Sequence, residues 1–145
     1  MSCRGWRGVP RSIGAVVAFQ TAVLSYGGVV HVVQLATGGW PPYQWAPTWL
    51  ATYFTSLTLL DPLAATLLWA RRATGLYLSI LVFVTDAAAN GYAAYGLTGA
   101  TATAAARTSQ AIISVLALAT MITAPWVRPW MVNGSARHPL PPGTL

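Results

Sequence analysis

Residues 49–96 read WLATYFTSLTLLDPLAATLLWARRATGLYLSILVFVTDAAANGYAAYG. Two apolar segments, 49–70 and 75–96, flank the basic pair Arg71 and Arg72. Each segment has close to the ~20 residues that a helix needs to cross about 30 Å of hydrocarbon. Helices are expected because a helix satisfies its backbone hydrogen bonds within one segment, as a bilayer requires. The short turn between the segments makes the two helices antiparallel neighbours.

Two further apolar segments, 13–37 and 109–130, lie on either side of this pair. Both are long enough to form membrane-spanning helices. The sequence therefore predicts an all-α integral membrane protein with one transmembrane domain over residues 1–132, an up-down bundle of four transmembrane helices. Residues 133–145 are rich in Pro and Gly, and we expect them to form a disordered cytoplasmic tail.

The composition argues against an ordinary soluble domain. Of the 145 residues, 55% are hydrophobic and 7% are charged, whereas soluble domains contain about 25% charged residues. The basic residues are all arginines and lie between apolar segments rather than on one surface, so nucleic acid is not an expected partner. The expected surroundings are a lipid bilayer. The absence of Lys and Glu and the abundance of Ala, Gly and Pro indicate GC-rich coding, which favours the cell membrane of a bacterium.

The arginines also predict the orientation of the chain. If the N-terminus is cytoplasmic, Arg107 is the one arginine that lies outside. Cytoplasmic loops of membrane proteins carry an excess of Lys and Arg, so this sequence favours a topology with both termini inside. Tryptophans gather at the predicted boundaries, where their rings prefer the interface. The aromatic residues of the loop 38–47 could bind a ligand, but we expect them to act as such interfacial anchors. The arginines on the cytoplasmic side are Arg4, Arg7, Arg11, Arg71, Arg72, Arg128 and Arg137.

The two acidic residues of the chain, Asp61 and Asp86, are both predicted near the middle of the membrane. A charged Asp at that depth costs on the order of 2.5–3.5 kcal/mol on insertion scales. From the helical rise, Asp61 lies roughly 14 Å and Asp86 roughly 17 Å from the cytoplasmic end of its helix. The two carboxylates can meet if their helix faces turn toward each other, and a close pair would not be ionised at both members.

Other polar groups accompany the carboxylates. Asn90 lies one turn beyond Asp86 on the same helix face. Pro62 has no N–H to donate to the carbonyl of Thr58, so that carbonyl is left free about one turn from Asp61. A kink, a free carbonyl and a carboxylate at one level are features of the broken-helix ion sites of transporters.

On the first predicted helix, Gln20, Gly27, His31 and Gln34 fall along one stripe. His31 is expected about 10 Å farther outward than Asp61. These positions predict a water-accessible pocket that opens outward. The plainer interpretation is that the polar side chains bond to one another and hold the helices together.

Small residues predict where helices approach each other closely. Gly14 and Ala18 are such positions on the first helix, and residues 87–96 of the third are mostly Ala and Gly. We expect these residues to serve packing.

Motifs for metals and cofactors are absent from the sequence. There is no Cys-x-x-Cys pair, zinc motif, phosphate loop or dinucleotide fingerprint. His138, in the polar tail, is a poor second ligand for a haem bound by His31. No metal and no cofactor are expected, and no serine or cysteine nucleophile signature indicates an enzyme.

Three functional hypotheses remain. The leading one is a midplane site that binds or conducts a proton, a small cation or the polar group of an amphiphile. The second is a structural or accessory subunit of a homo-oligomer or a larger membrane complex. The third is a lipid-modifying enzyme that uses His31 and the carboxylates as acid and base. The candidate site residues are Asp61, Asp86, Asn90, His31, Gln34 and Thr58.

Overall fold

The computed structural model describes residues 6, 8–97 and 101–132. Within them the chain forms four α-helices: α1 (Arg11–Thr37), α2 (Thr48–Trp69), α3 (Ala73–Gly91) and α4 (Ala104–Val127). A π-helical segment, η2 (Tyr92–Leu97), continues α3, and a 3₁₀ turn, η4 (Arg128–Trp130), continues α4. The described residues form no β-strand, so the all-α prediction is confirmed. The predicted cytoplasmic tail, 133–145, lies outside the described residues.

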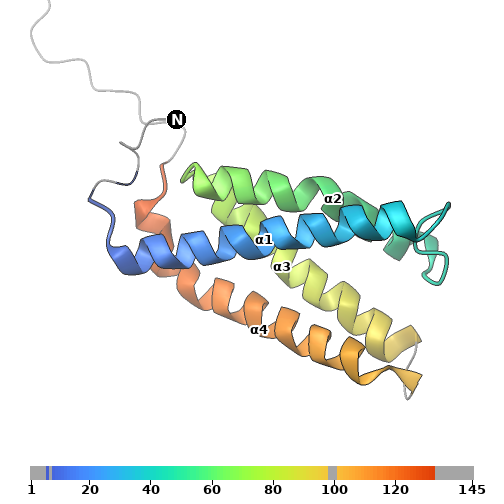
Figure 1. The fold of residues 1–145 in the computed structure, drawn as a ribbon. Coiled ribbons are helices and arrows are strands. Elements are labelled where there is room, and N and C mark those ends of the chain that lie inside the picture. Colours follow the sequence, from blue (N-terminus) through green and yellow to red (C-terminus); the bar gives the residue numbers. More distant parts are fainter. Residues whose placement is uncertain (1–5, 7, 98–100, 133–145) are drawn as a thin grey trace, which may run out of the picture.

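Successive helices run in opposite directions and pack on one another in chain order (Figure 1). The α1 and α2 helices lie side by side, α3 packs on α2, and α4 packs on α3. The α1 and α4 helices approach each other at one end of the molecule and diverge toward the other. We call the first end the basic end, because Arg11, Arg71, Arg72 and Arg128 lie there. The loop end is the opposite one, which carries the loop 38–47.

Three helical segments, Arg11–Thr37, Ala73–Leu97 and Ala104–Trp130, are long and apolar enough to cross a membrane. This finding supports the predicted transmembrane helices at three of the four positions. The α2 helix is long enough, at 22 residues, but it does not meet the same test of apolar composition. Its threonines, Asp61 and Pro62 lower its mean hydropathy.

The fourth helix begins earlier than predicted, at Ala104 rather than Ser109. Thr103 caps it, because the Thr103 side chain accepts a hydrogen bond from the Ala106 N–H at 3.2 Å. A side-chain cap satisfies one of the free N–H groups at a helix start. The Ala- and Thr-rich residues before 109 therefore add helical turns at the loop end.

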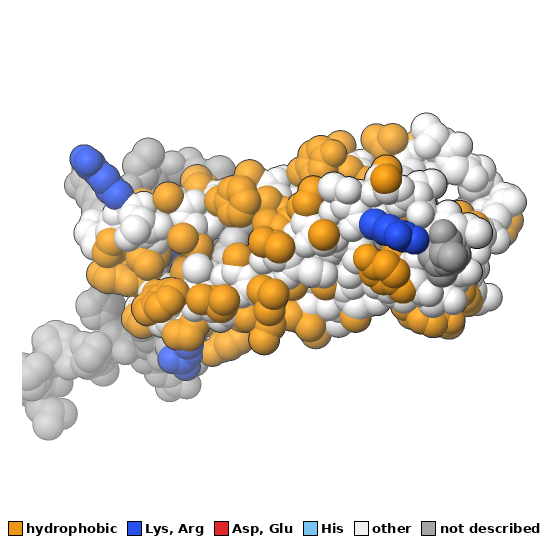
Figure 2. All heavy atoms as spheres, turned by 90° about the horizontal axis from the view of Figure 1, so that it is seen from below, with side chains coloured by type: hydrophobic (Ala, Val, Ile, Leu, Met, Phe, Trp, Pro, Cys, Tyr) orange, Lys and Arg blue, Asp and Glu red, His pale blue; other side chains and the backbone are white. Residues whose placement is uncertain are grey.

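The outer surface is apolar over most of its length. On the face shown in Figure 2, arginines lie toward the ends, hydrophobic side chains cover the middle, and no acidic side chain is visible. Large side chains such as Leu59, Tyr26 and Val115 are exposed. A soluble monomer rarely exposes so much contiguous apolar surface, so this surface suits contact with lipid.

The basic end is closed by contacts between α4 and the α2–α3 turn. Arg71 has a left-handed backbone (φ 57°), and its carbonyl accepts a hydrogen bond from the Val132 N–H at 2.6 Å. The Arg71 Nε donates to the Trp130 carbonyl at 3.0 Å, and its guanidinium lies 5.6 Å from the Trp6 ring centre. These contacts hold the end of α4 against the rest of the molecule.

The small residues predicted to allow close helix packing are right in part: an added Cβ at Gly91 would lie 3.1 Å from Gln110 Nε2 of α4, but the two positions predicted on α1 do not meet a neighbour. A Cβ added at Gly14 would meet nothing within 4 Å, and Ala18 is exposed. Close approach occurs instead at Gly28, where an added Cβ would lie 3.2 Å from Pro62 Cδ. It occurs also at Gly75, where an added Cβ would meet the backbone of Leu67 and Leu68. The prediction for Gly14 and Ala18 was wrong because small side chains alone do not say which face of a helix meets a neighbour.

Candidate functional site

A cavity of about 770 Å³ lies between α1, α3 and α4, and one buried face of α2 forms its floor. Five of the six predicted site residues line it, whereas Thr58 does not. The structure therefore brings side chains from three helices and both predicted carboxylates to one cavity. The lining residues predicted from the sequence are Asp61, Asp86, Asn90, His31 and Gln34.

Asp61 faces α1 at a point where α1 has no side chain. Its side chain is buried, with 4% of its surface exposed. A Cβ added at Gly27 would lie 2.6 Å from the Asp61 Oδ2, and one at Gly28 would lie 3.5 Å from the Asp61 Cβ. The Gly27–Gly28 pair thus makes the room that the carboxylate occupies.

The two carboxylates differ in their hydrogen bonds. Asn90 Nδ2 donates to Asp86 Oδ1 at 2.8 Å and to the Asp86 carbonyl at 3.0 Å, as the spacing of one helical turn predicts. In the part of the chain that the structure describes, Asp61 has no hydrogen-bond partner, and the two carboxylates are not bonded to each other. Asp61 is therefore a buried carboxylate that faces a cavity without a partner.

His31 lies toward the loop end from Asp61. A Cβ added at Gly27 would meet the Asp61 side chain, and His31 is one helical turn, about 6 Å, farther along α1. The separation of about 10 Å expected from the sequence stays a prediction.

A chain of hydrogen bonds ties His31 to the loop. The Tyr43 hydroxyl donates to Gln34 Oε1 at 3.1 Å and lies 3.1 Å from His31 Nδ1. Since the hydroxyl proton points to Gln34, the proton of the second bond comes from His31 Nδ1. Burial raises the pKa of the Tyr43 phenol, and the charge of Asp86 raises it further, so Tyr43 keeps the proton that it donates.

Four aromatic rings gather at the loop end of the cavity, and we call them the aromatic rim: His31, Tyr43, Trp45 and Phe54. The Phe54 ring is at the centre. Its centroid lies 6.1 Å from that of His31, 5.4 Å from Tyr43 and 6.2 Å from Trp45. All four residues line the cavity.

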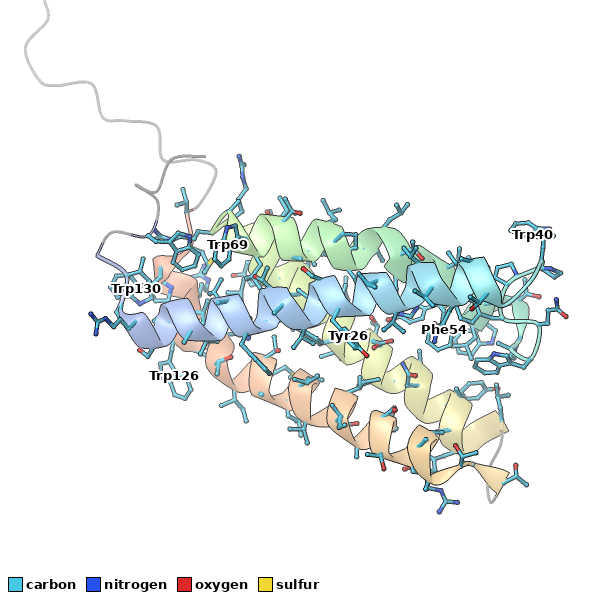
Figure 3. All side chains as sticks on the ribbon, in the orientation of Figure 1. Tyr26, Trp40, Phe54, Trp69, Trp126 and Trp130 are labelled. Atoms are coloured by element: carbon cyan, nitrogen blue, oxygen red, sulfur yellow. The ribbon has the colours of Figure 1, made fainter. Side chains whose placement is uncertain are left out.

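Sequence reasoning missed the aromatic rim. The sequence analysis did not single out Phe54, and it favoured interfacial anchoring over ligand binding for the loop aromatics. Trp40 does point away from the helices (Figure 3) and is 88% exposed, but Tyr43 and Trp45 fold back over the cavity. The available signal was the presence of Trp40, Tyr43 and Trp45 in one short loop. Which of these rings point outward and which cover the cavity depends on the loop conformation.

The side of the cavity between α1 and α4 is apolar. Tyr26, which is 71% exposed, projects from α1 toward the gap where α4 diverges (Figure 3). Toward the basic end a second, smaller cavity of about 350 Å³ follows the same groove. The buried Gln20 crosses that groove, and its Nε2 donates to Thr123 Oγ1 of α4 at 3.2 Å. The apolar residues that line the main cavity on this side are Phe19, Ala22, Val23, Ile112, Ile113 and Leu116.

Within residues 6, 8–97 and 101–132, no three His, Cys, Asp or Glu side chains come close enough together to hold a metal ion. Thr58 makes no contact with the cavity, although its hydroxyl is buried without a hydrogen-bond partner. Comparisons with protein-family models, curated proteins and solved structures found no match to this chain.

Proposed function

We propose that this protein is a four-span membrane protein that binds a positively charged group at Asp61 and Asp86. The observation that carries the proposal is the Asp61 side chain, which is buried, faces a cavity and has no hydrogen-bond partner among the described residues.

The α2 helix crosses the membrane with the others in this proposal. It packs between α1 and α3, and both of those helices are apolar enough to span. An α2 helix of 22 residues has a length of about 33 Å. Its acidic residue, Asp61, is buried against protein, and the exposed Thr52 and Thr66 hydroxyls donate to carbonyls of their own helix.

The distribution of arginines supports a cytoplasmic basic end, with both termini inside. Among the described arginines, Arg107 is the one that lies near the loop end. The excess of positive charge marks the cytoplasmic side of a membrane protein. With that orientation, the loop 38–47 and the aromatic rim face outward, and the cavity opens toward the outside of the cell.

A packing role does not account for Asp61. Buried polar groups that hold a protein together are nearly always hydrogen bonded, and an unpaired buried charge is costly. Gln110 shows the structural case, because its Nε2 donates to the Ala87 carbonyl at 2.9 Å and joins α4 to α3. Asp61 has no such bond to another described residue, so in this proposal a ligand supplies its partner.

The other predicted residues take supporting roles. Asn90 holds the Asp86 carboxylate in one orientation through the bond to Oδ1. His31 and Gln34 hold Tyr43 over the outer part of the cavity. The free carbonyl of Thr58 stays a prediction, since Thr58 does not line the cavity.

Chemical modification tests this proposal. Dicyclohexylcarbodiimide is an apolar reagent that reacts with carboxyl groups inside membranes, and mass spectrometry locates the adduct. We expect Asp61 to react faster than Asp86, because the Asp86 carboxylate already accepts a hydrogen bond from Asn90. We also expect at least one of three cationic probes, namely sodium, guanidinium or phenylbutylamine, to slow the reaction at Asp61. An unreactive Asp61, or a reaction that none of the three probes slows, would overturn the proposal.

A further inference from the structure

We infer that the cationic group belongs to an amine with an apolar body, which enters the cavity sideways from the bilayer between α1 and α4. This inference rests on the proposed function, since it names the ligand of the same carboxylates. Four features carry it: the few oxygen ligands, the aromatic rim, the cavity volume and the apolar opening.

The cavity offers few ligands to a bare metal ion. Hard cations such as Ca²⁺ and Mg²⁺ take about six or more oxygen ligands. The carboxylate and amide oxygens that line the cavity without a donor from the loop belong to Asp61, Asp86 and Asn90, and the hydroxyl-bearing Ser109 and Tyr26 also line it. Gln34 Oε1 already accepts from Tyr43. An alkylammonium group needs fewer oxygen atoms, because its N–H groups each require one acceptor and its carbon atoms require none.

The aromatic rim suits the substituents of such an ammonium group. Aromatic faces attract cations and alkylated ammonium groups, at about 0.5–2 kcal/mol for each contact. His31 lies one helical turn, about 6 Å, beyond the Gly27 position that touches Asp61. Phe54 lies seven residues from Asp61 on α2, about 10 Å by the helical rise, so the body of an amine held by Asp61 extends toward the aromatic rim of the same cavity.

The volume and the opening indicate an apolar body. A cavity of about 770 Å³ falls in the range of about 300–1,000 Å³ that is typical of drug-sized ligands, and a small ion would leave most of it unfilled. The side wall carries Phe19, Val23, Ile112 and Leu116. A chain or ring that lies against this wall remains in contact with lipid, so entry from the bilayer requires no passage through water.

The test measures thermal unfolding of the purified full-length protein in lipid nanodiscs with three additives: phenylbutylamine, phenylbutanol and sodium chloride. The amine and the alcohol share an apolar body and differ in charge. A ligand that binds only the folded state raises the unfolding temperature. We expect phenylbutylamine to raise it by about 5 °C at saturating concentration, with little effect of the alcohol or the salt.

Variants locate the site. Asp61→Asn is expected to abolish the shift, and Trp45→Leu is expected to reduce it, whereas Trp40→Leu in the same loop should leave it unchanged. Ile113→Trp fills the opening from α4 and should also abolish the shift. Its matched control is Val115→Trp, because Val115 is exposed on the same helix and does not line the cavity. If Asp61→Asn does not fold, the comparison of Ile113→Trp with Val115→Trp still tests the site.

Each other outcome overturns the inference in a distinguishable way. Equal shifts with the alcohol and the amine would mean an apolar site without charge recognition. A shift with sodium chloride alone would overturn the amine and leave the proposed function standing. If no additive shifts the wild type and none protects Asp61 from the carbodiimide, both the inference and the proposed function fail. A shift that Ile113→Trp leaves intact would overturn lateral entry.

Discussion

At the scale of single residues, the contrast between the two carboxylates is the most informative feature. Both acids stood out in the sequence because they are costly in a membrane, and both line the cavity. Their hydrogen bonds set them apart: Asp86 has Asn90, and Asp61 has no partner in the described chain. The sequence placed Asn90 on the same helix face as Asp86, because one helical turn separates the two residues. It did not predict that Gly27 would leave room for Asp61, since this depends on how α1 rotates against α2.

The Asp86–Asn90 pair gives a prediction at this scale. Asn90→Ala removes the donor to Asp86 Oδ1 and leaves a half-buried carboxylate unpaired, which should lower the stability by about 1–3 kcal/mol. Thermal unfolding in nanodiscs measures the loss. Gln44→Ala is the control, because Gln44 is exposed in the loop. When Asp86 is already replaced by Ala, Asn90→Ala should lower the stability less than it does in the wild type. If the stability losses of the two single variants simply add in the double variant, the pair does not interact.

At the scale of elements, the sequence predicted where the helices lie along the chain but not which face of each helix packs against a neighbour. Hydropathy located all four helices within a few residues, apart from the earlier start of α4, which depends on the Thr103 cap. Apolar residues surround a membrane helix on both its lipid and its protein faces, so the pattern does not say which side meets a neighbour. For this reason Gly14 and Ala18 were chosen wrongly, and the close contacts at Gly28 and Gly75 were not foreseen.

The α2–α3 turn gives the prediction for this scale. Gly75→Ala places a methyl group against the backbone of Leu67 and Leu68, which cannot move aside as a side chain does. We expect a loss of about 2 kcal/mol or more, comparable with overpacking of a core. Gly14→Ala adds the same methyl group in open space and should change the stability little. If the unfolding temperatures of the two variants agree within error, the packing of this turn is wrong.

At the scale of the whole molecule, one end is closed and the other is open. Arg71, Trp130 and Val132 join the elements at the basic end, whereas α1 and α4 diverge toward the loop end (Figure 1). The cavity occupies this divergence, and the loop aromatics cover part of it. The sequence predicted a pocket that opens outward, but the lateral opening between α1 and α4 follows from helix crossing angles that no local pattern encodes.

The central claim is that Asp61 is kept for a ligand and not for stability. The most direct measurement compares the thermal unfolding of wild-type protein and Asp61→Asn in lipid nanodiscs without added ligand. The Gln110→Leu variant is measured beside them, because it removes a buried side chain that joins two helices and should lower the unfolding temperature. We predict that Asp61→Asn unfolds at the same temperature as the wild type or at a higher one, since an amide costs less to bury than a carboxylate. An unfolding temperature for Asp61→Asn as low as that of Gln110→Leu would contradict the account, because Asp61 would then be a structural residue.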